Sequence, residues 1–301
     1  MVVLVTGADG QLGKCIADSS KIFNNENTYY FFNRKKLDIT NCFESSKLIS
    51  EINPDVIINC AAYTDVKGAE NNQYDAMIIN EYGPKYLVEA CKACKSNPFL
   101  IHISTDFVFD GYRRRNPYTE DDITNPLNVY GKTKKEGENA VIEYEKGIVI
   151  RTSWLYSEYG KNFYRVMSER IHFKMKTNVI NDQIGTPTYA RELSDFIVNI
   201  LIKDTDLDKK CGLYHFSNNG QASWYDFASS IETLQREVGE KNDNITHERY
   251  IIPTTTEEYG DKVRRPKYSV LCKDKIEEAF NYVPDHWLSA LVKCMKNDDE
   301  I

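Results

Sequence analysis

The sequence lacks any apolar run close to the roughly 20 residues that a helix needs to cross a bilayer. It also lacks a basic segment followed by an apolar stretch at its start, where Met1 to Gly7 instead have the pattern of a buried strand. We therefore expect neither a membrane protein nor an exported protein, and the expected compartment is the cytoplasm.

An excess of positive charge is lacking as well. The formal net charge is −7, which argues against a nucleic-acid-binding surface. The densest basic run, Arg113-Arg114-Arg115, is therefore interpreted as a solvated loop rather than a phosphate-binding patch. The expected partner is a small molecule, with neither nucleic acid nor membrane.

Paired cysteines at the spacing of a zinc site are also lacking. The eight cysteines are scattered along the chain, and only Cys91 and Cys94 form a C-x-x-C, with no second pair at zinc-finger spacing. These two lie in a stretch with helical periodicity, so we interpret them as structural rather than as metal-binding or redox-active. Without an export signal, free thiols are expected. No residue is predicted as a metal ligand.

What the sequence does contain is a regular alternation of short apolar strands and amphipathic helices in its first half. Strands that are apolar throughout indicate a parallel sheet covered on both faces. The predicted fold class is therefore α/β, with a Rossmann-type doubly wound parallel sheet. Thr40 is the predicted N-cap of the second helix. The strands are predicted at 2–5, 29–32, 55–59, 99–104 and 147–151, and the helices at 12–22, 40–52, 76–95 and 130–144.

The pattern becomes less regular after about Ser153, where tyrosine, asparagine and charged residues become more frequent. This predicts a smaller lobe of mixed α+β structure. Residues 178–181 and 192–203 nevertheless resemble a strand and a helix of the sheet domain. We therefore predict an interleaved division, in which 1–155 and 176–204 form the sheet domain and 156–175 and 205–301 form the second lobe.

Three glycines follow the first strand at a spacing of three residues. Such a loop turns sharply, approaches a pyrophosphate closely and presents the N–H groups of the next helix to it. An ordinary tight turn is the alternative, but the position between the first strand and the first helix favours a dinucleotide site. The predicted contacts are Gly7, Asp9, Gly10, Gln11 and Leu12.

The end of the second strand carries the signal for the choice of coenzyme. NAD-selective domains place an acidic residue there for the ribose 2′-hydroxyl, whereas this chain has Asn33 followed by Arg34 and two lysines. These cations could neutralise a 2′-phosphate, which favours NADPH. They could also be solvated surface charge, so NADH stays open. Asp38 and Ile39 are predicted beside the adenine.

Tyr130 and Lys134 lie four residues apart at the start of a predicted helix, so both project from one face. A neighbouring ammonium favours the phenolate and is expected to lower the pKa of Tyr130, making its hydroxyl a usable proton donor. An ordinary surface pair is the alternative reading of this spacing. The hydroxyl-bearing Ser104 and Thr105 end the fourth strand, at the edge where such sheets bind ligands.

These residues together resemble the extended short-chain dehydrogenase/reductase family. Within it, the sequence is similar to the dTDP-4-dehydrorhamnose reductases along nearly its whole length. The matching segments are NCAAYT at 59–64, STDFVFDG at 104–111, PLNVYGKTK at 126–134, RTSW at 151–154, NDQIGTPT at 181–188, GLYH at 212–215 and RRP at 264–266.

The resemblance implies reduction of the C4 ketone of a nucleoside-diphosphate 4-keto-6-deoxy sugar, above all dTDP-4-dehydro-L-rhamnose, with NADPH as the coenzyme and the second lobe binding the sugar nucleotide. Thr105, Tyr130 and Lys134 would form the catalytic triad. Further cofactor contacts would come from Cys60, Ala61, Ala62, Tyr63 and Asn80. Tyr130 and Lys134 would also contact the cofactor, Lys134 through the nicotinamide ribose. Substrate contacts would come from Thr105, Asp106, Phe107, Trp154, Asn162, Gln183 and Arg265.

Some features leave alternatives open. Trp154 could be a core residue, and His102 and His215 are interpreted as structural. Lys67-Gly68 stands where the family has Asp-Lys. Magnesium is associated with the family, but no compact carboxylate cluster in this sequence requires it.

Two other functions also fit parts of the pattern. A sugar-nucleotide dehydratase is disfavoured because Phe107 follows Thr105-Asp106 where dehydratases carry a second acid, while other sugar-nucleotide epimerases and reductases remain alternatives. A non-catalytic NADP-binding relative, the regulatory β subunit of methionine adenosyltransferase, shares the loop and the tyrosine–lysine helix. The choice between dTDP and UDP, and the oligomeric state, for which a homodimer is one option, stay open.

Overall fold

The computed structural model describes residues 1–23, 26–112, 116–239 and 248–298. The basic run Arg113-Arg114-Arg115 lies outside the described residues. No helix in the described part is long and apolar enough to span a membrane.

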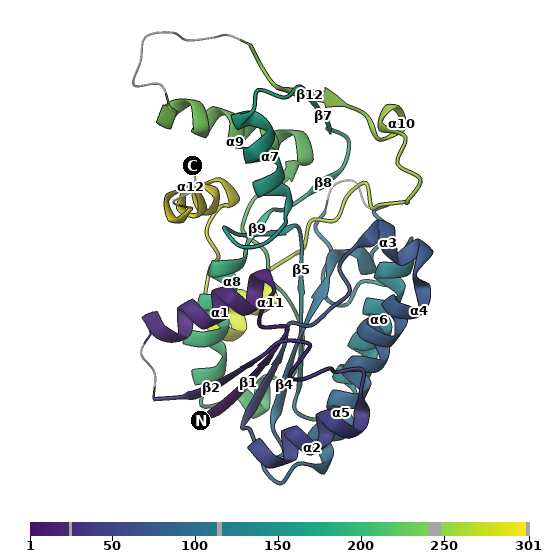
Figure 1. Cartoon of the computed structure of the whole chain (residues 1–301), viewed down its shortest axis with the longest axis vertical. Helices are drawn as coiled ribbons and strands as arrows, with labels where there is room; N and C mark the ends of the chain where they lie inside the picture. The colour runs from purple at the N-terminus through teal and green to yellow at the C-terminus, as the bar shows by residue number, and fades with distance from the viewer. Residues whose placement is uncertain (24–25, 113–115, 240–247, 299–301) are drawn as a thin grey trace.

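A six-stranded parallel sheet with the order β10-β5-β4-β3-β1-β2 forms the centre of the lower domain in Figure 1. This confirms the predicted doubly wound Rossmann-type fold. The chain crosses from β1 outward to β2 and then returns through β3 to β5, so the order reverses beside β1, where ligands bind in such sheets. The strands are β1 (Val2–Thr6), β2 (Thr28–Phe32), β3 (Val56–Asn59), β4 (Phe99–Thr105), β5 (Gly147–Thr152) and β10 (Gly212–His215).

Helices cover both faces of this sheet (Figure 1). One face carries α1 (Gln11–Ile22), α8 (Ala190–Asn199) and α11 (Asp274–Phe280). The other carries α2 (Cys42–Ile52), α5 (Gly83–Ala93) and α6 (Val129–Ile142). The predicted helix at 76–95 is divided into α4 (Gln73–Met77), a π-helical turn η1 (Ile78–Tyr82) and α5. Short elements near these are α3 (Val66–Asn71) and the 3₁₀ turns η2 (Asp106–Val108), η3 (Leu201–Lys203) and η4 (Leu207–Lys210).

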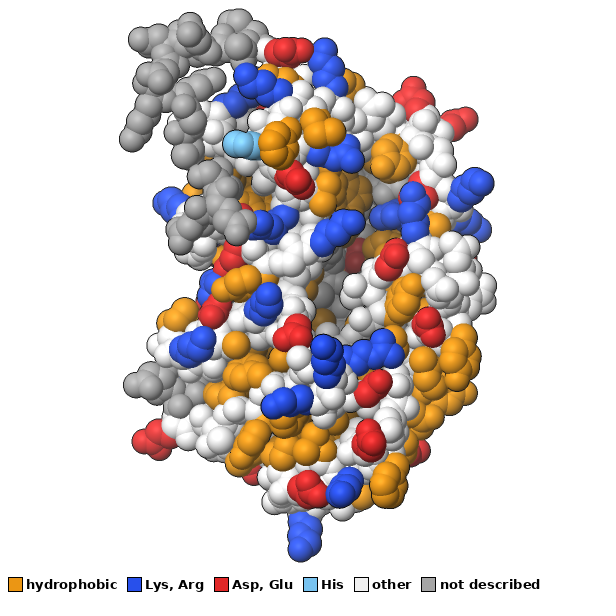
Figure 2. Space-filling model, viewed as in Figure 1, with side chains coloured by type: hydrophobic (Ala, Val, Ile, Leu, Met, Phe, Trp, Pro, Cys, Tyr) orange, Lys and Arg blue, Asp and Glu red, His pale blue; other side chains and the backbone are white. Residues whose placement is uncertain are grey.

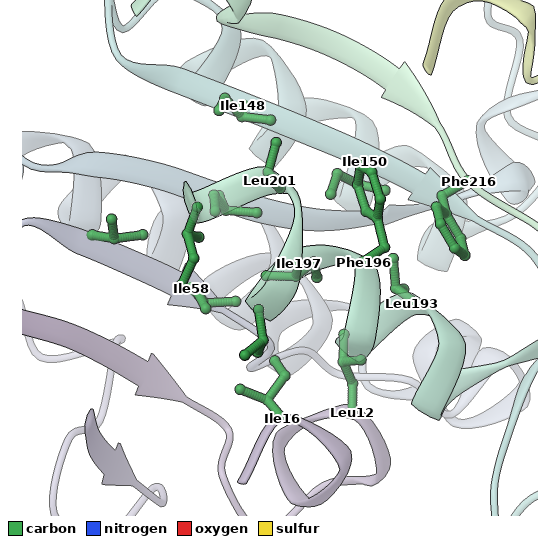
Figure 3. Close-up of a cluster of buried hydrophobic side chains, with 14 of the residues drawn as sticks. Leu12, Ile16, Ile58, Ile148, Ile150, Leu193, Phe196, Ile197, Leu201 and Phe216 are labelled. Atoms are coloured by element: carbon green, nitrogen blue, oxygen red, sulfur yellow. The ribbon is translucent and has the colours of Figure 1, made fainter. Parts of the chain in front are cut away.

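The core between α1, α8 and the sheet fixes the start of α1 at the sheet edge. Leu12 and Ile16 of α1 meet Leu193 and Phe196 of α8 over Ile150 of β5 (Figure 3). All five side chains are at most 5% exposed. Burying a side chain of this size stabilises a fold by about 1.5–3 kcal/mol. This packing holds the glycine loop, which immediately precedes α1, in one position.

The second lobe has its own core between α7 (Phe163–His172), α9 (Trp224–Gly239) and α12 (Trp287–Asn297). Three two-stranded pairings connect its short strands to one another, and α10 (Thr256–Tyr259) follows the last strand. The pairs are β6 (Leu155–Tyr156) with β9 (Thr188–Tyr189), β7 (Thr177–Ile180) with β12 (Ile251–Thr254), and β8 (Ile184–Gly185) with β11 (Ala222–Ser223).

Two local predictions are wrong. The strand predicted at 178–181 does not join the central sheet, because β7 pairs with β12, while β10 takes the edge beside β5. A short apolar strand carries no mark of its partner, which the packing of the whole chain selects. Thr40 is not the cap of α2, because Asn41 accepts the hydrogen bond from the Glu44 backbone N–H at 3.1 Å. The predicted helix at 192–203 does pack on the sheet, as α8.

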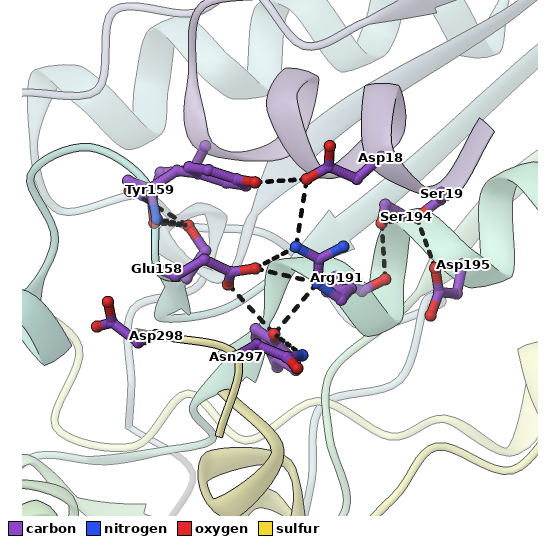
Figure 4. A network of polar contacts seen from close by, with 12 residues as sticks. Asp18, Ser19, Glu158, Tyr159, Arg191, Ser194, Asp195, Asn297 and Asp298 are labelled. Carbon is purple, nitrogen blue, oxygen red and sulfur yellow. Dashed lines mark hydrogen bonds and ion pairs between the residues drawn. The ribbon is translucent and has the colours of Figure 1, made fainter. Parts of the chain in front are cut away.

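A network of charged side chains connects the sheet domain to the loop after β6 (Figure 4). Arg191 at the start of α8 forms ion pairs with Glu158, which follows β6, and with Asp18 of α1. Tyr159 also donates to Asp18. Because this network is mostly shielded from water, it fixes the loop after β6 relative to α1 more firmly than an exposed ion pair would.

Candidate active site

The glycine loop forms a cradle that side chains would fill. Gly7 has φ +63°, and a Cβ there would lie 2.7 Å from the Ala61 backbone nitrogen. A Cβ on Gly13 would lie 2.6 Å from the Gly7 carbonyl oxygen. Gly10 is the N-cap of α1 and has no side chain that could accept from the first N–H groups of the helix. These N–H groups therefore face the glycine loop. This arrangement fits a pyrophosphate. Leu12 can contribute only its backbone, since its side chain lies in the core.

At the end of β2, the residues predicted near the adenosine lie close together but differ in character. Asn33 donates a hydrogen bond to Asp9 at 2.9 Å, which joins the glycine loop to the neighbouring strand. Arg34 is 73% exposed and forms an ion pair with Asp38 at 3.4 Å. Ile39 is buried in the core against Gly83. Arg34 therefore places an exposed positive charge at the end of β2. An adenine contact by the Ile39 side chain stays a prediction.

The segment after β3 is held by two buried asparagines. Asn59 accepts hydrogen bonds from Thr6 at 2.7 Å and from the Ala61 backbone at 3.2 Å. Asn80, in the π-helical turn η1, accepts from the Tyr63 backbone N–H at 2.8 Å and donates to the Tyr63 carbonyl at 3.0 Å. π-helical turns occur frequently at functional sites. The backbone from Cys60 through Ala62 to Tyr63 is thereby fixed beside the glycine loop.

The proposed catalytic residues meet at the carboxyl end of β4. The Thr105 hydroxyl lies close enough to the Tyr130 hydroxyl to lower its pKa, and the Tyr130 ring packs edge-on against Phe107 with centroids 5.6 Å apart. The N-cap of α6 is Asn128, whose side chain accepts from the Gly131 backbone at 2.8 Å. A Cβ on Gly131 would lie 2.2 Å from the Phe107 carbonyl oxygen. This glycine therefore lets α6 approach β4 closely enough for Tyr130 to reach Thr105.

Lys134 is turned toward β4 and is only 2% exposed. Its Nζ donates to the Ile103 carbonyl at 2.6 Å and lies 3.2 Å from the His102 Nε2. Burial lowers the pKa of Lys134 to about 8, against the opposing effect of the Glu138 carboxylate. Tyr130 and Lys134 thus share one face of α6, as the spacing predicts.

The predicted lowering of the Tyr130 pKa is wrong for this structure. Burial raises the pKa of Tyr130 to about 12, and the nearby Thr105 hydroxyl offsets only part of that increase. The physical reason is that the Lys134 ammonium is directed at the Ile103 carbonyl and His102 rather than at the phenol. Tyr130 is therefore a neutral hydroxyl at physiological pH, the form that can donate a proton.

Asp106 is a buried carboxyl next to this pair. The Thr105 hydroxyl donates to it at 3.2 Å, and Ser269 from the carboxyl-terminal part of the chain lies close enough to lower its pKa. Its Oδ2 is buried and has no partner among the described residues. Burial raises the pKa of Asp106 to about 7. The side chain is thus suited to binding a hydroxyl of a ligand.

We expect Asp106→Asn to change how stability depends on pH. The folded-state pKa lies above the unfolded value, so the folded protein retains this proton while the unfolded chain loses it. The contribution of Asp106 to stability therefore falls as the pH rises from about 4 to about 7. The variant should gain on the order of 2–4 kcal/mol over wild type between pH 4 and pH 8, measured by urea unfolding.

Asp110→Asn is the matched control, because hydrogen bonds from Tyr112, Asn125 and Tyr118 lower the pKa of that carboxyl despite its partial burial. It should be less stable than wild type by a constant amount above about pH 5, and this difference should shrink as the pH falls below about 4. Parallel stability curves for wild type and Asp106→Asn would contradict the expectation.

Aromatic rings line the predicted substrate side. Trp154 has φ +47°, a conformation rare for a bulky residue and often found at functional sites. Its ring stacks on the Trp224 ring with centroids 3.5 Å apart. The Phe163 ring packs against the Trp224 ring, with centroids 4.6 Å apart. A Cβ on Gly185 would enter the Trp154 ring. Trp224 carries no local motif and therefore could not be predicted from the sequence.

Asn162 and Gln183 are both engaged within the fold. Asn162 caps α7, accepting from the Arg165 backbone and donating to the carbonyl of Ser157. Gln183 is buried and donates to Thr256 at 3.1 Å. Their predicted substrate contacts stay predictions, and for Asn162 the structural role is already evident.

Arg265 is joined to the sheet domain through a shared carboxylate. Asp261, whose side chain is 4% exposed, lies 3.3 Å from Arg265 and 3.4 Å from Lys67 of α3. Asn128 at the start of α6 donates to the Arg264 carbonyl at 2.9 Å. These contacts bring Arg265 to the α6 side of the site, and its buried Nε has no partner among the described residues. Asp261 was not predicted from the sequence.

The space-filling view shows a hollow between the two lobes, with lysine and arginine side chains around it on this face (Figure 2). Phosphate groups would be attracted to such a rim, because several cations add to the same local potential. Within the described residues, no group of three or more His, Cys, Asp or Glu side chains is placed to hold a metal ion.

Comparisons with known proteins agree with this geometry. The family model of the RmlD substrate binding domain matches residues 1–299. A dTDP-4-dehydrorhamnose reductase of Aggregatibacter actinomycetemcomitans is 39% identical over 96% of both chains. A dTDP-4-keto-6-deoxy-D-glucose reductase of Streptomyces niveus is 33% identical over 99% of this chain and 98% of the other. The structure of a dTDP-4-dehydrorhamnose reductase from Bacillus anthracis in complex with NADP is 34% identical, with a TM-score of 0.84 over 98% of this chain and 99% of that one. The chain belongs to the RmlD family, defined by the RmlD substrate binding domain.

Proposed function

We propose that this protein is an oxidoreductase that uses NADPH to reduce the C4 ketone of a nucleoside-diphosphate 4-keto-6-deoxy sugar, with dTDP-4-dehydro-L-rhamnose as substrate and dTDP-L-rhamnose as product. The observation that carries the proposal is the position of Tyr130 at the carboxyl end of β4, where its ring packs on Phe107 and its hydroxyl lies beside that of Thr105. Lys134 lies one helical turn further along α6, and the glycine cradle lies at the end of β1. The relatives named above supply the substrate class.

The coenzyme supplies the hydride when bound. Tyr130 is the proton donor to the ketone oxygen, since burial keeps its hydroxyl protonated. Thr105 hydrogen-bonds the same oxygen and holds it in line with the phenol. Lys134 contributes positive charge to stabilise the oxygen as negative charge develops on it. Phe107, packed on the Tyr130 ring, keeps the hydroxyl in one position.

The adenosine side of the cradle supports NADPH. Asn33 occupies the position where NAD-selective domains have an acid, and the exposed Arg34 follows it. The related Bacillus anthracis structure is in complex with NADP. NADH is the second coenzyme to test, and no group of His, Cys, Asp or Glu side chains among the described residues is placed to hold magnesium.

The substrate would occupy the hollow between the lobes. Trp154 would face the sugar nucleotide, Asp106 would bind a sugar hydroxyl, and Arg265 would hold the diphosphate through paired hydrogen bonds. In this proposal residues 1–155 and 176–204 remain the dinucleotide-binding part and 156–175 and 205–301 the substrate part, except that β10 belongs to the central sheet and β7 does not. The eight cysteines are free thiols, which supports a cytoplasmic location.

The test is consumption of NADPH with purified dTDP-4-keto-6-deoxy sugars, with the matching UDP sugars and NADH as parallel arms. We expect turnover with the dTDP ketone, slower turnover with the UDP ketone and none with dTDP-glucose, which has no ketone at C4. Tight NADPH binding without turnover of any ketone would contradict an enzyme and favour the non-catalytic regulatory role. Size-exclusion chromatography of the same protein measures whether it is a homodimer.

A further inference from the structure

A continuous chain of buried polar side chains connects the glycine-loop strand to Lys134. Thr6 of β1 donates to Asn59 of β3 at 2.7 Å. The Asn59 amide nitrogen lies 3.0 Å from Nδ1 of His102 on β4, and the His102 Nε2 lies 3.2 Å from the Lys134 Nζ. Thr6, Asn59, His102 and Lys134 are at most 2% exposed. Because each member is shielded from water, its hydrogens must be shared with neighbouring protein groups.

The orientation of the Asn59 amide determines which nitrogen of His102 carries the hydrogen. The Asn59 Oδ1 accepts from the Ala61 backbone N–H, which can only donate, so the amide nitrogen must face His102. That nitrogen is a donor, and Nδ1 must therefore be the acceptor. Burial and the neighbouring Lys134 lower the pKa of His102 well below its usual value, so the ring is neutral. In a neutral ring the hydrogen then lies on Nε2.

This tautomer matters because Nε2 faces Lys134. An ammonium has only hydrogens to offer and cannot accept from an Nε2–H, whereas a neutral amine has a lone pair that can. The Ile103 carbonyl, at 2.6 Å, accepts a hydrogen from Nζ in either form. The other titratable groups around Lys134 are Glu138 and Tyr130 on α6 and Cys60 after β3. Glu138 favours the ammonium, and burial keeps Cys60 a neutral thiol with a pKa of about 12.

We propose that His102 is a positioning residue for the reduction: Asn59 holds its ring in the Nε2–H tautomer, and that N–H stabilises the neutral amine that remains after Lys134 gives up its proton. The inference rests on the proposed function. Tyr130 loses its proton to the ketone oxygen in each turnover, so the phenolate must regain one. Lys134 points at the Ile103 carbonyl in this structure and supplies the proton by turning its Nζ toward the phenol. The neutral amine left behind accepts the hydrogen bond from His102 and takes a new proton from solvent before the next turnover. One proton moves and no electron is exchanged in this step.

The first experiment compares the pH profiles of kcat for wild type, His102→Leu and His102→Gln. Leucine removes the donor, so the alkaline limb, which reports loss of the proton from the Lys134–Tyr130 pair, should move up by about one pH unit, the size of one hydrogen bond. Glutamine can accept from Asn59 and donate to Lys134, and it should restore the wild-type limb. His215→Leu is the matched control, since His215 is also buried on a central strand beside a cation, Arg151.

A fall in kcat for His102→Leu with an unmoved alkaline limb would show a merely structural role and overturn the proposal. The second experiment does not depend on turnover: ¹⁵N NMR of histidine-labelled protein identifies the nitrogen that carries the hydrogen. We expect His102 to be the Nε2–H tautomer across neutral pH, and an Nδ1–H tautomer or a charged ring would overturn the proposal. If no ketone is reduced while NMR finds Nε2–H, the proposed function fails but the hydrogen-bond assignment of His102 stands.

Discussion

Tyr130→Phe should lower kcat for ketone reduction by about 10²–10⁴-fold, the usual contribution of a positioned general acid. Phenylalanine keeps the ring that packs on Phe107 and removes only the hydroxyl that meets Thr105. The proton for the ketone oxygen would then have to come from water. Because the ring is retained, NADPH affinity and the unfolding temperature should change little. Stopped assays of product formation and fluorescence titration with NADPH measure the two effects separately.

Tyr74→Phe is the matched control, since Tyr74 is 68% exposed and lies outside the site. It should have wild-type kcat. A Tyr130→Phe variant that keeps more than about a tenth of the wild-type rate would show that another group donates the proton. A variant that loses NADPH binding together with the rate would instead point to a damaged coenzyme site.

Glu138→Gln should destabilise the fold by about 3–5 kcal/mol, because it leaves a buried guanidinium without its carboxylate. Arg151 of β5 donates to both carboxylate oxygens of Glu138, at 2.9 and 2.8 Å, and the two side chains are 1% and 0% exposed. Ser104 donates to the same carboxylate at 2.6 Å. Glutamine can accept one of these hydrogen bonds but cannot neutralise the charge. Urea unfolding followed by circular dichroism measures the loss.

Two further variants test the cause. Replacing both partners, as Glu138→Leu with Arg151→Met, removes the unpaired charge and should recover much of the lost stability. Lys209→Met breaks an exposed ion pair with Asp206, in which the side chains are 79% and 58% exposed, and should cost less than about 1 kcal/mol. If Glu138→Gln costs no more than Lys209→Met, the buried pair does not stabilise this fold as described.

The sequence predicted the sheet domain well because its signals are local. The spacing of apolar residues distinguishes helix from strand, and the three glycines after β1 announce the sharp turn that the structure shows at Gly7. The four-residue spacing of Tyr130 and Lys134 places both on one face of α6 by helix geometry alone. Thr105 could be placed at the same edge because parallel strands end together. The family resemblance then named the ligand, which these patterns alone do not specify.

The tertiary structure decided which strand pairs with which and what each buried polar group faces. Nothing within residues 178–181 or 212–215 distinguishes a lobe strand from a sheet edge, and Trp224 and Asp261 acquire a role only through contacts distant in sequence. The pKa of Tyr130 is raised because burial outweighs a lysine whose ammonium is aimed elsewhere. Element type depends on neighbours three or four residues away. Partner choice, burial and proton affinity depend on the packing of the whole chain, so these properties required the folded structure.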